Sequence, residues 1–378
     1  MKTTLHLLLL TLTLLLTGAL ISCRTTDDPG PDTAATEEDL TDPVTDVTEP
    51  LTEAPTEAPT EAPTEPDTAP ETLPANARQL IPDVTFLTGM KQISQKDHND
   101  HDKVTTLKTH SFYGGTADNP RWQLAQWDSG PCMVENEVDE GPTVITDGQH
   151  RTFGYDPETN VMTFRLDTSL FYQGQPALSG MYWPHLLIEQ GDFGYKSMST
   201  EEKAYYSCAA DRIILSMDIR LTDYSITPIK GDWVDAAQFL LYFYVKGIET
   251  NDFCWFGVQL FDNRWARNPN YIGYDGGKAD ASGAMIFSIG SQYVYPDRKV
   301  NLWKNNKINP SEDWIHIELD IRPFLNQMLK AGRADGYFKA ETLEELCING
   351  MNLGWETIGT FDHTMQVRDL KLVSYIDE

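Results

Sequence analysis

The most hydrophobic stretch outside the N-terminus is residues 236–264, AAQFLLYFYVKGIETNDFCWFGVQLFDNR. Two apolar, aromatic runs flank a polar turn, which predicts a β-hairpin. Strand side chains alternate between the two faces of a sheet, so the hairpin divides into two sets. The set expected in the core is Phe239, Leu241, Phe243, Val245, Cys254, Phe256, Val258 and Leu260. The set expected on the opposite face is Gln238, Leu240, Tyr242, Tyr244, Phe253, Trp255, Gly257, Gln259 and Phe261.

The same alternation predicts further strands along the chain. They cover residues 122–127, 161–166, 182–190, 211–220, 314–321 and 365–373. In 182–190, Leu186 and Ile188 are expected on one face, and the other face carries Trp183, His185, Leu187 and Glu189. In 211–220, the face opposite the apolar set carries Ile214, Ser216, Asp218 and Arg220.

One helix is predicted directly after the strand at 314–321. Pro323 is tolerated at the first helical position, and Gly332 is a plausible stop. The apolar stripe of this helix is Phe324, Leu325, Met328 and Leu329. A shorter helix is expected at 341–346. The fold class is therefore all-β: an antiparallel β-sandwich of the jelly-roll type with one or two short helices near the C-terminus.

Residues 1–22 have the form of an export signal. Lys2 gives a positive start, Leu5–Leu16 is an apolar run, and Leu20-Ile21-Ser22-Cys23 follows. A transmembrane helix needs about 20 apolar residues, and this run is shorter. The tetrapeptide resembles the bacterial lipobox, in which cleavage before the cysteine is followed by lipidation of its thiol. We therefore expect an exported protein that is lipid-anchored through Cys23 at the outer face of the bacterial cell membrane.

Residues 23–80 are expected to form a disordered tether. The segment repeats Thr-Glu-Ala-Pro, and residues 24–78 hold 15 acidic and 2 basic residues, a net charge of -13. Such a composition cannot bury enough apolar surface to offset chain entropy, and its prolines favour extended conformers. The remaining residues, 81–378, suffice for a single β-sandwich domain.

The net charge of -28 disfavours nucleic acid and anionic membrane surfaces as partners, so the membrane is reached through the lipid anchor alone. The histidines and aspartates of residues 96–103 lack a framework to fix them and favour a solvated loop over a metal site. No cofactor is expected, although the carboxylates between residues 135 and 140 leave a structural Ca2+ open. The cysteines beyond Cys23 are expected to be mostly buried free thiols.

The polar face of the predicted sheet is aromatic and amide-rich, which suits a saccharide. A pyranose packs its CH face on Trp or Tyr and presents hydroxyls to amide, acidic, His and Arg side chains. The candidate ligand-binding residues are Trp183, His185, Asp218, Arg220, Tyr242, Tyr244, Trp255 and Gln259. The alternative is that loops cover this face and make it a second core layer.

Zinc spacings, nucleotide-binding glycine loops and a Gly-x-Ser-x-Gly elbow are absent from the sequence. If the protein is an enzyme, its catalytic constellation would be a carboxylate pair, for which Glu189 and Glu356 are the candidates. Strand geometry puts His185 and Glu189 about 13 Å apart, so both would reach the same ligand only if it is extended.

The sandwich, the aromatic hairpin and the closing strand MQVRDLKLV resemble the broad jelly-roll group of carbohydrate-binding modules and concanavalin A-like glucanases, lyases and lectins. The phrases WPHLLIEQ and NLGWETIGTFD are similar to those of uncharacterised secreted proteins from gut-type bacteria. The resemblance implies a polysaccharide or oligosaccharide partner. Three hypotheses remain: a surface lipoprotein that binds polysaccharide, a glycoside hydrolase or polysaccharide lyase acting in the same groove, and a structural or protein-binding module.

Overall fold

The computed structural model describes residues 73–94, 104–117, 119–127, 133–177, 183–229, 235–276, 282–296, 302–304 and 307–377. These residues belong to the unit Thr68–Glu378. The predictions for the export signal, for Cys23, for most of the tether, for residues 96–103 and for Cys132 lie outside the described residues. Within the described ranges, no helix has the length and apolar character needed to cross a bilayer.

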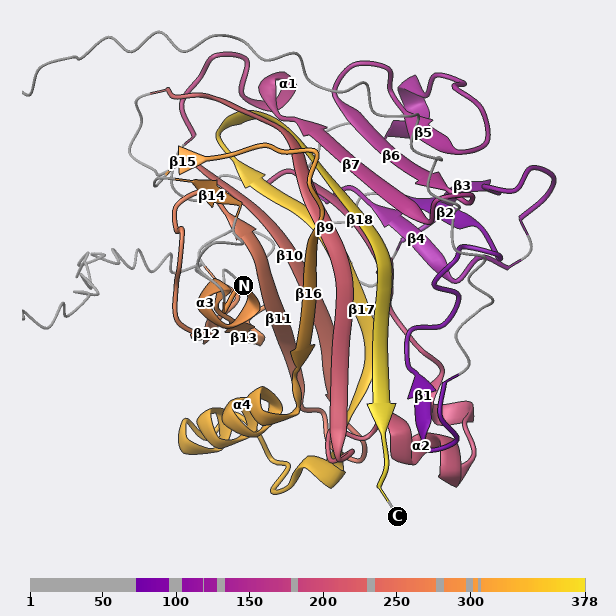
Figure 1. Cartoon of the computed structure of the whole chain (residues 1–378), viewed down its shortest axis with the longest axis vertical. Helices are drawn as coiled ribbons and strands as arrows, with labels where there is room; N and C mark the ends of the chain where they lie inside the picture. The colour runs from indigo at the N-terminus through magenta and orange to yellow at the C-terminus, as the bar shows by residue number, and fades with distance from the viewer. Residues whose placement is uncertain are drawn as a thin grey trace, which may run out of the picture. The chain divides into compact units, whose positions relative to one another are not determined.

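A nine-stranded sheet, sheet B, carries the predicted hairpin (Figure 1). In spatial order it consists of β12 (Tyr271–Tyr274), β13 (Met285–Ile289), β11 (Phe253–Asp262), β10 (Ala236–Gly247), β17 (Leu346–Ile358), β8 (His185–Gln190), β4 (Trp122–Ala125), β2 (Met90–Ile93) and β3 (Thr106–His110). Neighbouring strands are antiparallel except for the pairs β11–β13 and β2–β4.

The second sheet, sheet A, is antiparallel throughout and has seven strands. Its order is β16 (Ile315–Asp320), β9 (Arg212–Thr227), β18 (Thr360–Tyr375), β7 (Val161–Asp167), β6 (Arg151–Asp156) and β5 (Val144–Thr146), and β1 (Ala77–Gln79) pairs with the end of β18. A separate small ribbon joins β14 (Trp303–Lys304) to β15 (Lys307–Ile308). Regular structure thus begins within the last residues of the predicted tether.

Helices are few and short, as expected for this class. They are α1 (Ser169–Tyr172), α2 (Thr200–Tyr206), α3 (Ser291–Val294) and α4 (Arg322–Ala334), with single 3-10 turns at Met133–Asn136, Tyr195–Ser197 and Leu343–Glu345. The stripe of α4 is buried as predicted. Its end was predicted wrongly, because the helix continues past Gly332. That glycine is needed for close packing, since a Cβ there would lie 2.2 Å from the Phe338 ring.

The inner faces of the two sheets meet in one apolar core. Trp355 of β17 has no exposed surface and packs edge-on against Phe239 at 5.0 Å, and Phe239 in turn packs on Phe164 of sheet A at 5.3 Å. The indole Nε1–H donates to the backbone oxygen of Phe164 at 3.1 Å, so the buried polar atom is satisfied. The structure is a mainly antiparallel two-sheet sandwich of the predicted jelly-roll type.

The predicted division of the hairpin holds with one exception. The expected core set is buried, and Cys254 is a buried free thiol, as are Cys208 and Cys347. Phe261 was expected on the outer face and is instead buried against Trp355. The cause is a β-bulge in the β10–β11 pairing, where Phe239 pairs with Phe261 and Leu240 with Gln259. The extra residue turns Phe261 into the core.

Candidate functional site

The outer face of sheet B, which faces away from sheet A, is covered on one side. Every residue of β8 is buried, including the outward-pointing His185, Leu187 and Glu189. Leu187 belongs to a small apolar cluster with Ile93 and Ala125, against which Trp127 packs. The alternative of a second core layer is therefore correct for the half of the sheet that contains β4 and β8.

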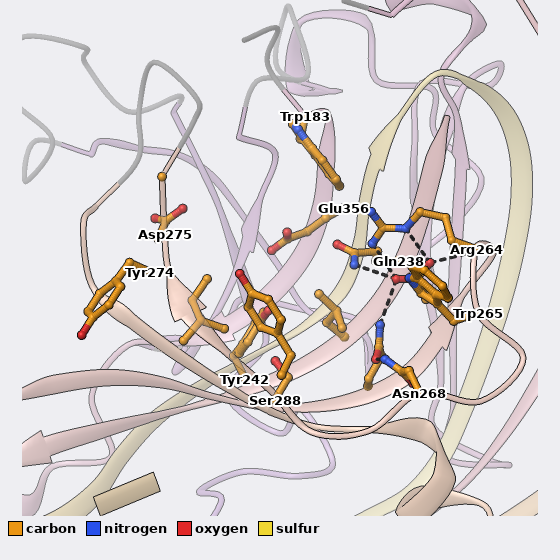
Figure 2. Close-up of a pocket in the computed structure, with 16 residues that line it drawn as sticks. Trp183, Gln238, Tyr242, Arg264, Trp265, Asn268, Tyr274, Asp275, Ser288 and Glu356 are labelled. Atoms are coloured by element: carbon orange, nitrogen blue, oxygen red, sulfur yellow. Dashed lines mark hydrogen bonds and ion pairs between the residues drawn. The ribbon is translucent and has the colours of Figure 1, made fainter. Parts of the chain in front are cut away.

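The other half of this face is open and holds a cleft of about 460 Å3. Its lining comes from Trp183, two residues before β8, from β17, β10, β11, β13 and β12, and from the segment after β11 (Figure 2). The lining residues are Trp183, Gln238, Leu240, Tyr242, Gln259, Asp262, Arg264, Trp265, Asn268, Tyr271, Tyr274, Asp275, Gly276, Ile286, Ser288 and Glu356. The cleft runs across the strands, over five inter-strand spacings or about 24 Å.

Aromatic rings form the walls of the cleft. Trp265, Tyr271 and Tyr274 are 54%, 52% and 44% exposed, values that are unusual for neighbouring large rings. Trp183 is half-buried because it packs on the small apolar cluster that includes Ala236 and Ile358. Figure 2 shows Trp183 above Glu356, Trp265 beside Arg264, and Tyr274 at the far side of the cavity.

Asp262 is the centre of a polar network in the floor. Its Oδ2 accepts from Nε2 of Gln238 and Nε2 of Gln259 at 2.9 Å each, and from the Arg264 guanidinium at 2.6 Å. Its Oδ1 accepts from the backbone N and the Nε of Arg264 at 2.9 Å each. A carboxylate has about four lone-pair sites, so both oxygens are fully used. The bulge that buries Phe261 is also what keeps Asp262 on the outer face beside Gln259.

The network continues away from Asp262. The Asn268 amide donates to Oε1 of Gln259, and Oδ1 of Asn268 accepts from the backbone N and hydroxyl of Ser291 at 3.0 and 2.7 Å. Each amide is thereby held in one orientation before any ligand arrives. Such preorganisation reduces the ordering cost of binding.

Tyr242 lies across the floor because its neighbour on β11 is a glycine. Gly257 is the direct partner of Tyr242, and a Cβ there would be 2.5 Å from Cε1 of the tyrosine ring. Burial and the nearby Glu356 carboxylate raise the pKa of Tyr242, so its hydroxyl stays protonated at neutral pH. The ring presents one flat apolar surface to the cleft and keeps a hydroxyl donor at its edge.

Glu356 and His185 are direct partners across β17 and β8. The Nε2 atom of His185 lies 3.6 Å from Oε1 of Glu356, and the two side chains are 4% and 20% exposed. Glu356 lines the cleft, whereas His185 lies behind it.

The second predicted carboxylate does not reach the cleft. Glu189 is buried, accepts from the Tyr244 hydroxyl at 3.0 Å, and also accepts from Gln123. Burial and this carboxylate raise the pKa of Tyr244 well above its usual value. In register, Glu189 pairs with Asn352, four residues from Glu356 on the neighbouring strand, so the backbones of the two glutamates are about 14 Å apart. The structure thus does not bring Glu189 and Glu356 together.

Of the eight predicted ligand-binding residues, Trp183, Tyr242 and Gln259 line the cleft. His185 supports it from behind. Tyr244 and Trp255 lie on the same face in an aromatic cluster, their rings 5.0 Å apart, outside the cleft lining.

Asp218 and Arg220 lie elsewhere, and their grouping with the aromatic face is wrong. Both are on β9 in sheet A, where Asp218 pairs with His316 and with Arg368 at 2.8 and 2.9 Å. Arg220 stacks on Trp314 and donates to Gln366 at 2.6 Å. The alternation assigned them correctly to a polar face, but of the opposite sheet.

Several cleft residues were not among the sequence candidates: Gln238, Trp265, Asn268, Tyr271, Tyr274 and Asp275. Most of them belong to the segment after β11, which includes the short strand β12. The signal that would have found it is its density of aromatic and amide residues directly after the hairpin.

No protein-family model matches this sequence, and no curated protein matches it. Solved structures give likenesses of low score. An endoglucanase, Cel12A, from Rhodothermus marinus has 11% identity and a TM-score of 0.32, over 68% of this chain and 93% of its own. A family 12 xyloglucanase from Bacillus licheniformis has 9% identity and a TM-score of 0.35, over 63% and 96%.

The xyloglucanase domain of NopAA, a type three effector from Sinorhizobium fredii solved with cellobiose, has 11% identity and a TM-score of 0.32, over 70% of this chain and 97% of that one. These values are too low to transfer a substrate or a mechanism. The site of this chain has to be interpreted from its own residues.

Proposed function

We propose that this protein binds an extended, neutral polysaccharide in the cleft across the outer face of sheet B. The observation that carries the proposal is the lining itself: exposed Trp and Tyr rings surround a floor of amide and carboxylate groups fixed by mutual hydrogen bonds. Rings match the apolar face of a sugar and fixed polar groups match its hydroxyls. A length of about 24 Å favours a chain over a monosaccharide.

The charge of the cleft favours a neutral ligand. Among the described residues, the lining holds the carboxylates of Asp262, Asp275 and Glu356 and one guanidinium, that of Arg264, which is bound to Asp262. A uronate polymer would meet these like charges, and each repulsion disfavours its binding. For the same reason a polysaccharide lyase is not favoured, because it needs a cation available to the uronate.

Hydrolysis is the second candidate, and one observation favours it. Glu356, Gln238 and Asp262 are partners in register across three neighbouring strands, so Glu356 and Asp262 have backbones about 10 Å apart. In inverting glycosidases the two carboxyl groups themselves are about 6.5–9.5 Å apart, a separation that side chains on backbones about 10 Å apart can reach. Binding is the better-supported function, because the oxygens of Asp262 are already fully used.

The test is a binding screen of the full chain against a neutral β-glucan, a xylan, a mannan and starch, with polygalacturonate as the anionic comparison. Reducing ends are assayed on the same samples. Binding without new reducing ends supports the proposal, and release of reducing ends favours hydrolysis. Absence of binding to all of these polymers would refute a saccharide cleft.

Tyr242→Ala is expected to weaken binding of the best polymer about tenfold, equivalent to about 1.4 kcal/mol. The reason is the loss of the flat ring over the cleft floor. Isothermal titration calorimetry measures the change. The matched control is Trp314→Ala, directly before β16 of sheet A; its ring centroid lies 4.4 Å from the guanidinium carbons of both Arg220 and Arg368, and the residue is not in the cleft lining. Equal losses in the two variants would contradict the placement of the site.

The proposed location is the outer face of the cell membrane, with Cys23 as the lipidated residue and residues 23–80 as the spacer. Several acyl chains on one cysteine would give firm attachment. Cys23→Ser is expected to move the protein from the detergent phase to the aqueous phase in a Triton X-114 partition of expressing cells. Retention of this variant in the detergent phase would refute the anchor.

A further inference from the structure

The amides beside Asp262 form a chain of hydrogen bonds whose polarity is fixed at both ends. At one end, the Asp262 carboxylate only accepts, so the Gln259 group that contacts it is the amide nitrogen. At the other end, the backbone N of Ser291 only donates, so the Asn268 atom that it contacts is the amide oxygen. The link between the two amides then has one direction, in which Nδ2 of Asn268 donates to Oε1 of Gln259. Neither amide can be turned over without losing its contact with a fixed end.

Five residues of the lining make up what we call the amide corner: Gln238, Gln259, Asp262, Arg264 and Asn268. Within the described residues, each of the amides uses one of its two N–H groups, and Nη1 of Arg264 takes no part in the bonds to Asp262. Acceptors are scarcer, because both oxygens of Asp262 are fully used and Oδ1 of Asn268 accepts twice. Only the amide oxygens of Gln238 and Gln259 keep lone pairs, so the unused donors of the corner outnumber its unused acceptors.

A donor-rich corner selects a ligand group that accepts hydrogen bonds. Gln259 is only 6% exposed, and an N–H that is left unpaired once a ligand has displaced the water beside it costs free energy. A sugar hydroxyl can accept from such a group, but it brings a hydrogen of its own that also needs an acceptor. An ionised carboxylate accepts without donating, but the three carboxylates of the lining repel it. A neutral carbonyl oxygen satisfies the corner without either cost.

An apolar surface adjoins these donors. Leu240 is the direct partner of Gln259 across β10 and β11, and it lines the cleft. The exposed ring of Trp265 lies beside Arg264 at the same end of the cleft (Figure 2). Sugar hydroxyls gain nothing from a leucine side chain, whereas a methyl group buries apolar surface against it. Donors next to an apolar surface match the carbonyl and the methyl of an acetyl group.

We propose that the amide corner binds an acetyl substituent of the polysaccharide. The unused N–H groups of the corner donate to the acetyl carbonyl oxygen, and the methyl packs against Leu240 and Trp265. The inference rests on the proposed function and narrows its ligand to neutral glycans that carry acetyl groups. Such a group is either an ester on a sugar oxygen or the amide of a 2-acetamido sugar, and both forms present the same carbonyl and methyl.

Two pairs of ligands test the proposal, by isothermal titration calorimetry on the full chain. The first pair is the hexasaccharide of β-1,4-linked N-acetylglucosamine and cellohexaose, which share their linkage and differ in the acetamido group. The second pair is acetylated glucomannan oligosaccharides before and after mild alkali, which removes the acetyl esters. The acetylated member of at least one pair is expected to bind about tenfold more tightly than its partner.

The pattern of preference distinguishes the outcomes. A preference within one pair alone supports the proposal and identifies the acetyl group as an amide or as an ester. Equal or weaker binding of the acetylated member in both pairs overturns the acetyl site and leaves the saccharide cleft intact. Absence of binding to every one of these ligands and to the polymers of the screen overturns the proposed function, and the acetyl site with it.

Gln238→Met locates the site within the cleft, because methionine has nearly the volume of glutamine but no amide. The variant is expected to bind the acetylated ligand about threefold more weakly and to change the affinity for its partner less, so the ratio of the two affinities falls. A purely structural effect would lower both affinities equally. An unchanged ratio would overturn the assignment of the acetyl group to the amide corner.

The matched control is Gln366→Met on sheet A. Gln366 is also half-buried, and its amide likewise donates and accepts, to the Thr163 hydroxyl at 3.0 Å and from Nε of Arg220 at 2.6 Å. It is not in the cleft lining. Its ratio of affinities is expected to equal that of the wild type, and a fall as large as that in Gln238→Met would contradict the location of the site.

Discussion

Replacing Asp262 with alanine is expected to lower the free energy of unfolding by about 3–5 kcal/mol, the usual cost of removing one partner of a buried ion pair. The substitution leaves the half-buried Arg264 guanidinium without its counter-ion. It also removes the acceptor of two glutamine amides that are then partly desolvated. Urea unfolding at neutral pH, followed by tryptophan fluorescence, measures the change.

Saccharide binding should be lost in the same variant even where the protein is still folded, because Gln238, Gln259 and Arg264 lose their fixed orientations. The matched control is Asp275→Ala. Asp275 lines the same cleft, but its carboxylate accepts from the backbone N and the hydroxyl of Ser282, both at 2.7 Å, and does not join two strands. A small loss of stability is expected there. Comparable stabilities of the two variants would show that Asp262 is not the centre of the network.

Acid is expected to destabilise the protein through His363. This residue has no exposed surface, stacks on Trp355 with ring centroids 3.8 Å apart, and has Nε2 3.3 Å from the Thr357 hydroxyl. Burial, and secondarily the positive charge of Arg165, lowers the pKa of His363 from 6.5 to about 3. The ring therefore stays neutral in the folded state at pH values where the unfolded chain would bind a proton.

Because the unfolded state binds more protons between pH 6.5 and about pH 3, stability falls as the pH decreases through this window. The slope is about 1.4 kcal/mol per pH unit for one group, so a loss of about 2 kcal/mol is expected between pH 6.5 and 5. Urea unfolding at both pH values measures it.

His363→Phe keeps a ring but has no titratable nitrogen. It is expected to be less stable than the wild type at pH 7, since the Thr357 hydroxyl loses a partner, yet to have the shallower pH slope. The exposed His316→Asn should keep the wild-type slope. An unchanged slope in His363→Phe would mean that His363 is protonated in the folded state.

Alternation predicted the faces of individual strands well, because burial of one face is a local property with a period of two. The inner and outer sets of the hairpin and of β8 were correct apart from Phe261. Phe261 differs because a bulge is a feature of pairing between two strands, and the sequence of one strand does not reveal it. The same bulge puts Asp262 on the outer face, a position that alternation along its own strand does not predict.

The assignment of strands to sheets was the harder problem. Asp218 and Arg220 were placed on a polar face correctly, yet their strand belongs to sheet A. Glu189 was placed on the correct face, yet Tyr244 and Gln123, which lie 55 and 66 residues away in sequence, enclose it. Both outcomes depend on contacts between distant segments, which local patterns do not encode.

The depth of the cleft depends on a residue that no ligand would touch. The Tyr242 ring rests over Gly257 on the neighbouring strand β11, where an added Cβ would lie 2.5 Å from the ring. The glycine leaves a recess that lets this ring lie low. Related sheets could thus differ in the height of the cleft floor, and so in the thickness of polymer that fits. A larger residue beneath the ring would raise the floor, and a smaller residue in place of the ring would lower it.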